Sequence, residues 1–557
     1  MNAATNADQV VIVGGGPVGM MLALNLAALG VCSTLINRET GPRWHPKGST
    51  QNARTMEHYR RLGIVDAVRA VGLPRDLQTD VTYFTTLDGW ELARLTMPSE
   101  GEKLAARAAA PADDQEVEPL YRCNQMHAEA VLFDQVQACA LVDKRYGHEC
   151  TSWREDADGV TAEIENLANG RRETIRGRYI AGCDGARGIV RQQLGYAYRG
   201  ETPTMQPYLG GPMVSTYIRA ADIPKVARTR CWQYWVVNTH IRANIVAVDG
   251  KSEFLFTTKL DRPDQEPDEA RIAKAFRDAV GHDIAVEFVG HGTWTAGQFF
   301  VAEKFGAGRA WLAGDAVHLF TPTGGFGMNT GVDDAANLGW KLAAMVQGWG
   351  GAQLLDSYEA ERQPVAFRNT GASKALNSNV NATPVAPEIG QTSAAGDAAR
   401  RVAGEYLSGG RPEFASLGVQ LGARYDSSSI TVSDGTPPPA DDLFDYRPSG
   451  VPGGRAPHVW IGERHEAGDS LFDRFGTGFT VLRLGRKPAK ADGLLAAFAK
   501  KNVPVKTIDV DGAVARDLYE RDIVVVRPDQ HIAWRGNADP ADAEAVVAQM
   551  IGQQKSN

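Results

Sequence analysis

Cysteine is scarce in this 557-residue chain, and no two cysteines have the spacing that redox or metal chemistry uses. The six are Cys32, Cys123, Cys139, Cys150, Cys183 and Cys231. None forms a CxxC or CxxxxC pair, which counts against a zinc site and against a redox-active disulfide. We therefore expect no metal site in this chain.

Basic charge, long apolar runs and a basic leader are also missing. The formal net charge is -8 and the pI is near 5.8, which disfavours nucleic acid as a partner. No apolar run approaches the length of a membrane span, so we expect no membrane partner. No Lys or Arg precedes Arg38, so the basic part of a secretory signal is absent and we expect a cytoplasmic location.

What is present is the composition of an ordinary soluble globular protein, with 43% hydrophobic and 23% charged residues. A chain of this length exceeds what one hydrophobic core organises, so it should hold two or three domains.

A glycine-rich fingerprint opens the chain. An apolar strand, residues 10–13, runs into a GxGxxG turn and then into an apolar helix through about Leu29. In such a turn the first glycine permits the tight bend, the second lets backbone N–H groups approach a pyrophosphate, and the third lets helix and strand pack closely. The helix N-terminus adds partial positive charge. We expect a dinucleotide, NAD or FAD, to bind through Gly14, Gly16, Pro17, Val18 and Gly19.

The adenosine ribose of such a ligand should meet the end of the second strand, roughly 20 residues further on. Asn37, not an acid, holds that place here, with Arg38 and Glu39 next to it. An amide oxygen still accepts from a hydroxyl, so we predict Asn37 and Arg38 as ribose contacts. The alternative is a solvated turn with no ligand role.

Two further segments turn this common fingerprint into an FAD site. They are residues 180–187, IAGCDGAR, and residues 310–318, AWLAGDAVH. No second strand–GxGxxG–helix unit for a nicotinamide nucleotide follows. Together with the absence of a redox-active cysteine pair, this disfavours the disulfide-reductase branch of flavoproteins with two dinucleotide sites.

The order of elements predicts an α/β fold in which the fingerprint domain is interrupted. We expect a Rossmann-like FAD-binding domain, an inserted β-rich substrate domain and a C-terminal thioredoxin-like α/β domain. The predicted boundaries are 1–80, 121–200 and 301–400 for FAD binding, 81–120 and 201–300 for the substrate domain, 401–455 for a linker, and 456–557 for the thioredoxin-like domain, which has no cysteines. Residues 160–165 and 173–180 predict a hairpin, and the Ala-, Pro- and acid-rich residues 105–118 predict a mobile loop.

The most specific stretch runs from Gly314 to Gly331, GDAVHLFTPTGGFGMNTG, and continues to Asp334, Asn337, Leu338, Trp340 and Lys341. With the other two segments, it resembles the class A flavoprotein monooxygenases, the single-component aromatic hydroxylases. Within them it is similar to the phenol-hydroxylase-like group with a C-terminal thioredoxin-like domain. The resemblance spans nearly the whole chain.

This resemblance implies that Asp315 contacts the FAD ribitol and that the GGxGMN turn lies beside the isoalloxazine. The implied flavin contacts in this stretch are Gly314, Asp315, Pro322, Gly325, Gly327, Met328 and Asn329. Glycines let backbone approach a flat ring without Cβ clashes. The N-terminus of the following helix stabilises negative charge on the reduced flavin. The alternative is a structural Gly-rich loop.

Three other positions match the family. Asp184 lies in a motif linked to both FAD and NAD(P)H handling, although an Asp at a strand end also caps helices. Gln125 matches a glutamine that contacts FAD; on its own it would look like a surface residue. Lys47 stands where relatives usually have Arg, which keeps the charge but loses the bidentate fork.

The implied activity is hydroxylation of a small aromatic substrate. In this family NADH or NADPH reduces FAD, O2 adds at flavin C4a, and the hydroperoxide oxygen is transferred to a ring carbon ortho or para to a phenolate. Such a site must be dry. Dimers are common among relatives, so a homodimer is consistent with the resemblance.

The chain departs from phenol-hydroxylating relatives at Ser49. Some of them place Asp or His two residues after the basic position, and serine is a poor base. Candidate bases or hydrogen-bond partners in the β-rich region are His240, His291 and Tyr217, with Tyr234 beside them, although each has a structural alternative. If none acts, the substrate must arrive ionised, as an electron-poor nitro- or halogen-substituted phenol or catechol would, and hydroxylation at the substituted carbon would expel the substituent.

Two other functions fit the same cofactor motifs. One is a tailoring hydroxylase of polycyclic aromatic natural products, which would differ in pocket volume. The other is a noncatalytic FAD-binding protein, which would show no substrate-stimulated NAD(P)H oxidation.

Overall fold

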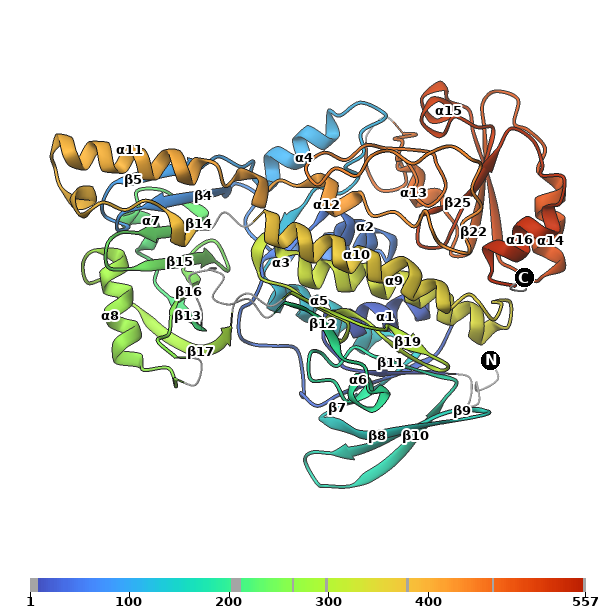
Figure 1. Cartoon of the computed structure of the whole chain (residues 1–557), viewed down its shortest axis with the longest axis horizontal. Coiled ribbons are helices and arrows are strands. Elements are labelled where there is room, and N and C mark those ends of the chain that lie inside the picture. Colours follow the sequence, from blue (N-terminus) through green and yellow to red (C-terminus); the bar gives the residue numbers. More distant parts are fainter. Residues whose placement is uncertain are drawn as a thin grey trace.

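The computed structural model describes residues 9–201, 212–262, 265–295, 299–376, 380–462 and 465–553. Figure 1 shows a central domain, a sheet-rich domain on one side of it and a C-terminal domain on the other. This arrangement confirms the predicted α/β class with an inserted β-rich domain and a C-terminal α/β domain.

The central domain is built on a six-stranded sheet with the order β19-β20-β11-β1-β2-β7. Its strands are β1 (Val10–Val13), β2 (Ser33–Asn37), β7 (Val142–Tyr146), β11 (Tyr179–Gly182), β19 (Gly306–Ala307) and β20 (Ala310–Leu312). All neighbours pair in parallel except β19 and β20. β1 is apolar and buried at every position, as expected of a parallel strand covered on both faces.

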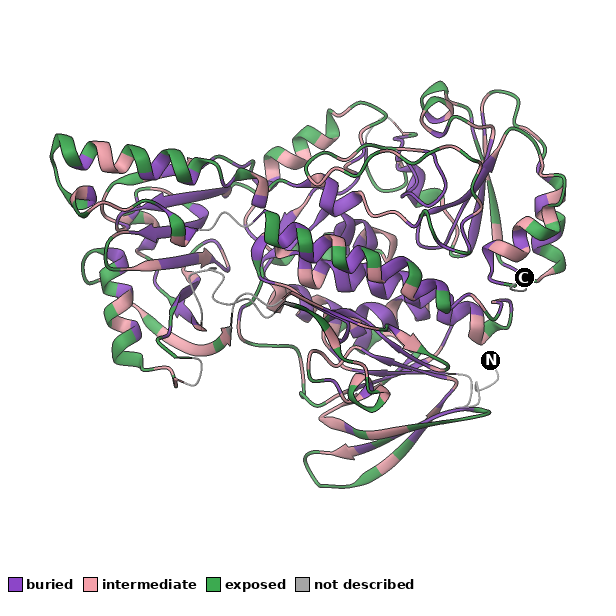
Figure 2. Cartoon of the chain, viewed as in Figure 1, coloured by how far each residue is buried: buried purple, intermediate pink, exposed green. Residues whose placement is uncertain are grey.

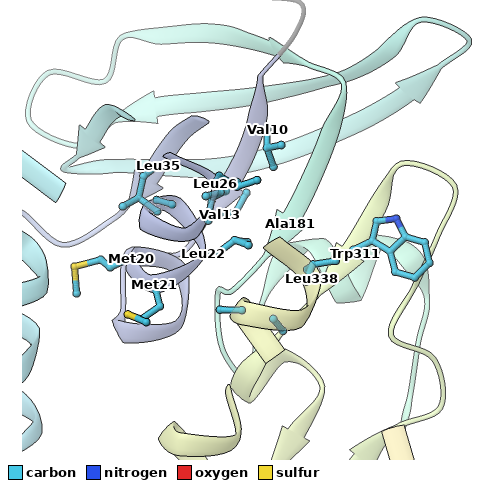
Figure 3. Close-up of a cluster of buried hydrophobic side chains, with 14 of the residues drawn as sticks. Val10, Val13, Met20, Met21, Leu22, Leu26, Leu35, Ala181, Trp311 and Leu338 are labelled. Atoms are coloured by element: carbon cyan, nitrogen blue, oxygen red, sulfur yellow. The ribbon is translucent and has the colours of Figure 1, made fainter. Parts of the chain in front are cut away.

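Helices α1 (Pro17–Ala28), α5 (Gln125–Ala138) and α9 (Phe326–Gln347) pack against this sheet. Figure 3 shows side chains of β1, α1 and α9 meeting in one apolar cluster, which includes Val10, Leu22, Leu26 and Leu338. Burial is concentrated in the central sheet and its helices, whereas the outlying sheet β8–β10 mixes buried, intermediate and exposed positions (Figure 2). The central sheet and its helices therefore form the buried core that positions the ends of the strands.

The outlying sheet consists of β8 (His148–Asp156), β9 (Gly159–Asn166) and β10 (Arg172–Gly177). β9 and β10 pair antiparallel, which confirms the predicted hairpin.

The inserted domain is a seven-stranded sheet with the order β17-β13-β16-β15-β14-β4-β5. Its strands are β4 (Gln78–Phe84), β5 (Glu91–Leu95), β13 (Pro212–Arg219), β14 (Cys231–Val237), β15 (Arg242–Ala247), β16 (Glu253–Lys259) and β17 (Glu287–Thr295). Helix α8 (Glu269–Val280) covers one face, where the rings of Phe256 and Phe276 lie 5.3 Å apart. The other face carries a mixed polar and aromatic row.

The C-terminal domain has a four-stranded sheet with the order β23-β22-β24-β25. Its elements are α13 (Leu471–Arg474), β22 (Phe479–Leu484), α14 (Asp492–Lys500), β23 (Val505–Val510), α15 (Ala513–Tyr519), β24 (Ile523–Val526), β25 (Ile532–Gly536) and α16 (Ala543–Met550). Only β22 and β23 pair in parallel.

Residues 105–118 are not the mobile loop that their composition predicts. Helix α4 (Glu100–Ala108) occupies the first part, and the second part packs against the C-terminal domain. Glu118 is buried between Arg60 and Arg69, at 2.6 and 2.7 Å. Long-range ion pairs therefore order a segment that has no apolar periodicity of its own.

The segment 401–455, which we predict to be a linker, is packed along much of its length. Helix α11 (Ala394–Ser408) lies on β5 so closely that a Cβ at Gly404 would collide with the carbonyl of Leu92. Helix α12 (Leu417–Leu421) follows, and the Gln420 side chain accepts a hydrogen bond from Ala53 N at 3.0 Å.

Across the described residues, no helix is both long and apolar enough to cross a membrane. Within the same ranges, no group of three or more His, Cys, Asp or Glu side chains is placed to hold a metal ion.

Candidate active site

The three segments of the predicted FAD site meet at one edge of the central sheet. β1 lies beside β11, with Val13 opposite Gly182, and β11 lies beside β20, with Gly182 opposite Leu312. All three strands run in the same direction, so their carboxyl ends and the turns that follow them are neighbours. Ligands of open α/β sheets bind at this edge.

The fingerprint turn is shaped to admit a pyrophosphate. Gly14 has a φ of +107°, and a Cβ there would collide with the carbonyl of Cys183. At Gly16, in contrast, a Cβ would meet nothing within 4 Å. No side chain of the described chain caps α1, and its first turn holds no acid. The free N–H groups and open space at this helix start fit an anionic phosphate.

Val18 connects the fingerprint to the third segment. A Cβ at Gly314 would lie 2.9 Å from Val18 Cγ2, and a Cβ at Gly331 would lie 2.6 Å from the same atom. The fingerprint helix and α9 can approach this closely only because both positions are glycine. Val18 thus fixes the first and third segments relative to each other.

Asp315 is exposed at the edge of the sheet, in a short 3₁₀ turn, Gly314–Ala316. Its backbone carbonyl accepts a hydrogen bond from the Tyr198 hydroxyl at 2.6 Å. Asp334 of α9 holds the turn by accepting from Gly314 N at 3.1 Å and contacting His318 Nε2 at 2.7 Å. Among the described residues no hydrogen bond or ion pair uses the Asp315 carboxylate, which leaves it able to accept from a ligand hydroxyl, as the predicted ribitol contact requires.

The flavin turn, residues 323–326, leads directly into α9. Gly324 and Gly325 have φ of +71° and +68°, a left-handed conformation that favours glycine. The first turn of α9 holds no acid, and within the described chain no side chain caps it. Pro322 is exposed, while Gly327 and Met328 are half-buried. This helix start fits negative charge on a neighbouring ring.

Asn329 attaches the flavin turn to the loop that precedes α2 (Ala53–Arg61). Its amide nitrogen donates to Thr50 O at 2.9 Å and to Gly325 O at 2.6 Å, and its oxygen accepts from Asn52 N at 2.9 Å. Asn329 is buried, and both its amide nitrogen and its amide oxygen form hydrogen bonds with backbone atoms. Its role here is to hold the turn in place.

Asn37 stands at the end of β2, beside the fingerprint. Its oxygen accepts from Gly15 N at 3.1 Å, so the amide supports the turn. Arg38 is exposed and lies 3.8 Å from Glu149. The ribose contacts of both residues stay predictions.

Asp184 binds the start of α6 (Ile189–Leu194), as the helix-cap alternative supposes. Its Oδ2 accepts from Val190 N at 3.2 Å, while Oδ1 has no hydrogen-bond partner in the described chain. Burial raises the pKa of Asp184 to about 6. A flavin contact by this carboxyl stays a prediction.

Lys47 and Gln125 lie on adjoining backbone. Gln125 N donates to Gly48 O at 2.7 Å, and its side-chain amide donates to Glu129 at 2.6 Å. Lys47 is exposed, and the surrounding chain and then Arg43 lower its pKa. The loop that carries Lys47 is thereby held against the first turn of α5.

The loop before α2 lies on the face of the seven-stranded sheet opposite α8. A Cβ at Gly292 would lie 3.3 Å from the His45 ring, and one at Gly290 would collide with Trp44.

The same sheet face carries a row of polar and aromatic side chains. Cross-strand register places in this row Ser215, Thr257, Asn244, Trp235 and Tyr83. Two buried amides of the same face, at Gln233 and Asn244, each leave one atom without a hydrogen-bond partner in the described chain. Such groups fit a polar ligand.

The candidate bases do not gather at one point. His240 is exposed in the turn between β14 and β15, and His291 contacts Thr216 Oγ1 at 3.0 Å on the face that α8 covers.

The two candidate tyrosines lie in the same sheet. Tyr217 is buried on the face opposite α8, and burial, followed by Glu253, raises its pKa to about 12. Tyr234 bonds backbone at Thr229, 3.1 Å away. Their catalytic roles stay predictions.

Two residues that sequence reasoning missed flank Ser49. Trp232 Nε1 donates to Ser49 Oγ at 3.0 Å. Arg122 is buried, with its guanidinium carbon 3.6 Å from the centre of the Trp232 ring, and it donates to Thr50 Oγ1. Burial lowers the pKa of Arg122 to about 9. In the sequence, the one feature that could have pointed to Arg122 is an arginine among mainly uncharged residues. The pairing of β3 (Thr50–Gln51) with β6 (Tyr121–Arg122), which brings Arg122 beside Thr50, could not be read from the sequence.

The geometry fits the FAD contacts that the sequence predicts. When bound, FAD supplies the electron transfer and the oxygen activation. The helix start at Pro17 would hold its pyrophosphate, Asp315 its ribitol and the flavin turn its ring. The loop before α2 lies against the face of the seven-stranded sheet opposite α8, where Trp44 approaches Gly290 and His45 approaches Gly292.

Comparisons with known proteins agree with this arrangement. An FAD binding domain family matches residues 7–373, and an aromatic-ring hydroxylase C-terminal family matches residues 449–553. A putative polyketide hydroxylase of Streptomyces halstedii is 31% identical, over 96% of this chain and 94% of its own. A 4-methyl-5-nitrocatechol 5-monooxygenase of a Burkholderia species is 30% identical, over 97% and 96%. The structure of the rebeccamycin biosynthetic enzyme RebC with reduced flavin superimposes with a TM-score of 0.87 at 32% identity, covering 98% of this chain and 99% of RebC.

These matches cover the cofactor edge, the open sheet face and the C-terminal domain together. The chain belongs to the single-component FAD-dependent aromatic-ring hydroxylases, monooxygenases that use FAD, NAD(P)H and O2.

Proposed function

We propose that the protein hydroxylates an electron-poor phenol or catechol, bearing a nitro or halogen substituent, and expels that substituent. The observation that carries this proposal is Ser49. It occupies the position where some phenol-hydroxylating relatives have Asp or His, and its oxygen accepts from the Trp232 indole. A neutral serine engaged in this way does not remove a phenol proton. A substrate that is already ionised at neutral pH needs no base.

The open sheet face supports a ring with polar substituents. Gln233 offers an acceptor atom and Asn244 a donor atom that no described group uses. A nitro oxygen accepts and a catechol hydroxyl donates, so such a ring satisfies both. The nitrocatechol monooxygenase of Burkholderia, 30% identical over nearly the whole chain, is named for a substrate of this class.

The reaction balances with one O2 and one NAD(P)H. For a nitrophenol, one oxygen atom forms a bond to the nitro-bearing carbon and the other leaves as water. The carbon–nitrogen bond breaks with both electrons going to nitrite. The ring, having lost the substituent, leaves as a quinone.

Steady-state kinetics test the proposal directly. The purified yellow holoenzyme would be supplied with NADH or NADPH and with phenol, 4-nitrophenol and 4-nitrocatechol in turn. We expect kcat/KM to be at least tenfold higher for the nitro compounds, with one nitrite released per O2 consumed. A higher kcat/KM for phenol, or turnover of nitrophenol without nitrite, would reject the proposal.

The runner-up is a tailoring hydroxylase of polycyclic aromatic natural products. The likeness to the polyketide hydroxylase and to RebC favours it. Ligands of one to four fused rings discriminate the two, because binding perturbs the flavin absorbance. Tighter binding with each added ring would support the runner-up. A noncatalytic FAD-binding protein would show no phenol-stimulated NAD(P)H oxidation at all, and the monooxygenase relatives disfavour it.

A further inference from the structure

We propose that Arg122 receives the ionised oxygen of the ring substrate and holds it in the phenolate form. This inference rests on the proposed function, which requires an ionised ring but leaves open what holds the charge.

Arg122 lies close to the flavin turn. Its strand β6 pairs with β3, and Arg122 stands opposite Thr50. Asn329 binds Thr50 O at 2.9 Å, and a Cβ at Gly325 would lie 2.9 Å from Thr50 Cβ. A single residue, Thr50, thus separates the guanidinium from the turn where the flavin ring is expected.

Within the described residues, Arg122 forms no ion pair with a carboxylate, although the buried Glu413 acts on its charge through space. Only 2% of the residue is exposed, and within the described chain no carboxylate oxygen lies within 4.0 Å of it. Its hydrogen-bond partner is the neutral Thr50 hydroxyl, and its Nε has no partner in the described residues. Glu413 and Lys103 are the charged groups near enough to act on it through space.

Other buried arginines of the protein are balanced differently. Arg362 pairs with Asp334 at 2.7 Å, Arg455 pairs with Glu57, and Arg527 pairs with Glu361 at 2.7 Å. Removing a guanidinium from water without a counterion is costly, and a cation–π contact offsets only part of that cost. If the sole function of an arginine were to support Trp232, a carboxylate paired with it would stabilise the protein. An arginine that receives an anionic ligand cannot be paired with such a carboxylate, because the carboxylate would repel the ligand.

The surroundings suit a phenolate. The Trp232 ring lies against the guanidinium, whose carbon is 3.6 Å from the ring centre, and the planar guanidinium has further N–H groups besides the one that binds Thr50. The Ser49 oxygen accepts from Trp232, which leaves the serine hydrogen available to an anion. A fixed positive charge beside a phenol favours the ionised form and lowers the pKa of that phenol. The positive charge of Arg122 would therefore keep the phenol ionised, although Ser49 cannot remove its proton as a base.

The test uses the FAD holoenzyme without reductant and 4-nitrophenol as the probe, because its phenolate absorbs visible light. Bound nitrophenol should ionise at a pH at least one unit lower than free nitrophenol. In Arg122→Met this lowering should vanish, and the Kd for the phenolate should rise at least tenfold. In Arg122→Lys, which keeps the charge but loses the planar fork, the lowering should persist while the Kd rises.

Arg219→Met is the matched control, since Arg219 is an exposed arginine of β13 paired with Glu253 and Glu287. It should bind nitrophenolate as the unmodified protein does. Flavin content and thermal unfolding confirm that each variant is folded. If Arg122→Met does not retain FAD, the Arg122→Lys result decides, since a loss of the lowering despite the retained charge contradicts the proposal.

Two results keep this inference separate from the proposed function. Nitrite release with no lowering of the bound nitrophenol pKa would overturn the role of Arg122 and leave the proposed reaction standing. Arginine-dependent phenolate binding without nitrite release would support Arg122 and refute the reaction.

Discussion

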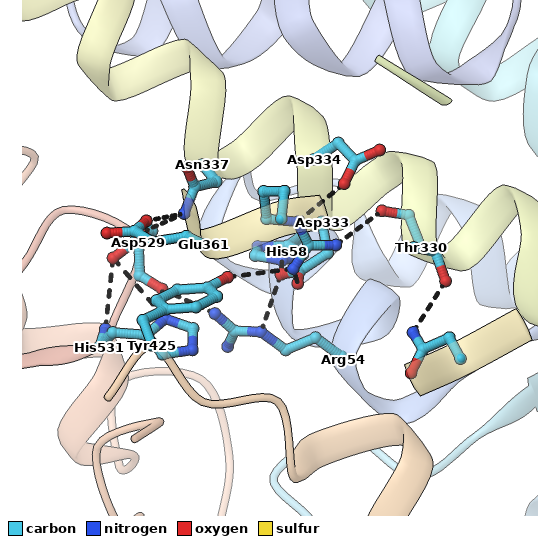
Figure 4. Close-up of polar contacts among 12 residues, drawn as sticks. Arg54, His58, Thr330, Asp333, Asp334, Asn337, Glu361, Tyr425, Asp529 and His531 are labelled. Carbon is cyan, nitrogen blue, oxygen red and sulfur yellow. Dashed lines mark hydrogen bonds and ion pairs between the residues drawn. The ribbon is translucent and has the colours of Figure 1, made fainter. Parts of the chain in front are cut away.

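Buried charge is handled in opposite ways on the two sides of the central domain. Toward the C-terminal domain lies an ionic cluster in which each cation has a carboxylate; its members are Arg54, Glu57, Asp333, Asp334, Lys341, Glu361, Arg362, Arg455, Arg527 and Asp529. Figure 4 shows part of it, with side chains from α2, α9 and the C-terminal domain converging. Toward the seven-stranded sheet, the described contacts of Arg122 are a hydroxyl and an indole ring, and the buried Glu413 acts on it through space without forming an ion pair.

The difference separates structure from function. A paired charge is satisfied within the chain and fixes how two domains dock. An unpaired charge is satisfied only when something else arrives. Whether a buried charge is paired thus indicates whether the residue belongs to the scaffold or to the site.

Glu361→Gln should produce the largest effect. Glu361 accepts from Lys341 and Arg527, both at 2.7 Å, and all three side chains are fully buried. Burial alone would raise the pKa of Glu361, but Arg527 and Lys341 outweigh it and lower the pKa to about 2. Its removal leaves buried cations short of a counterion, so we expect the free energy of unfolding to fall by about 3–5 kcal/mol.

Urea denaturation followed by tryptophan fluorescence measures this loss. Glu544→Gln is the control, because Glu544 pairs with Lys500 on the surface and should cost about 0.5 kcal/mol or less. Equal losses in the two variants would contradict the scaffold role of the cluster.

The stability of the same cluster should fall in mild acid because of His58. His58 is fully buried and contacts Asp333 at 2.9 Å; burial and then Arg54 lower its pKa from 6.5 to about 4. As pH falls, the unfolded chain therefore takes up the proton first, and stability is lost between pH 6.5 and 4. The loss from this one group should reach roughly 3 kcal/mol at pH 4.

His58→Gln keeps a donor toward Asp333 but does not titrate. Unfolding midpoints of the two proteins, measured from pH 8 to pH 4, should be parallel above pH 7 and diverge below pH 6.5, with the variant losing less. Curves that stay parallel throughout would exclude His58 as the source.

Arg122→Met should not lower the free energy of unfolding, in contrast to Glu361→Gln. Replacing an unpaired buried cation with an apolar side chain of similar length removes a desolvation cost, so we expect no loss, or a gain of about 1 kcal/mol. The same urea titration measures it. A loss of more than about 2 kcal/mol would place Arg122 among the structural charges.

The sequence was informative where chemistry is local. The fingerprint turn, the 310–318 segment and the flavin turn could be recognised because glycines at fixed offsets and strand–helix order have direct steric causes. Their convergence follows from parallel strands sharing one carboxyl edge, and the structure places all three there. The fold class followed from the same order of elements.

Long-range pairing set the limit of prediction. Arg122 lies beside Thr50 and Trp232 because two very short strands, residues 50–51 and 121–122, pair with each other, and no local pattern indicates that pairing. Glu118 is ordered by Arg60 and Arg69, which come from two other helices, so composition misrepresented its segment. Histidine is a common base, yet the exposure and direction of His240 and His291 depend on strand register, which single residues do not reveal.

The smallest expected effect concerns Asn37, where the fingerprint departs from its usual acid. Asn37 accepts from Gly15 N at 3.1 Å, and an aspartate can accept the same bond more strongly because it is charged. Asn37→Asp should therefore keep the turn and add an acceptor for the ribose hydroxyls, lowering the Kd for FAD about two- to fivefold, which corresponds to less than about 1 kcal/mol. Fluorescence quenching of FAD titrated with apoprotein gives the Kd, and Asn37→Leu, which loses the Gly15 bond, should weaken binding. If aspartate weakens binding as much as leucine does, the amide nitrogen that donates to Glu39 O at 3.4 Å matters more than the acceptor, and Asn37 supports its own loop rather than the ribose.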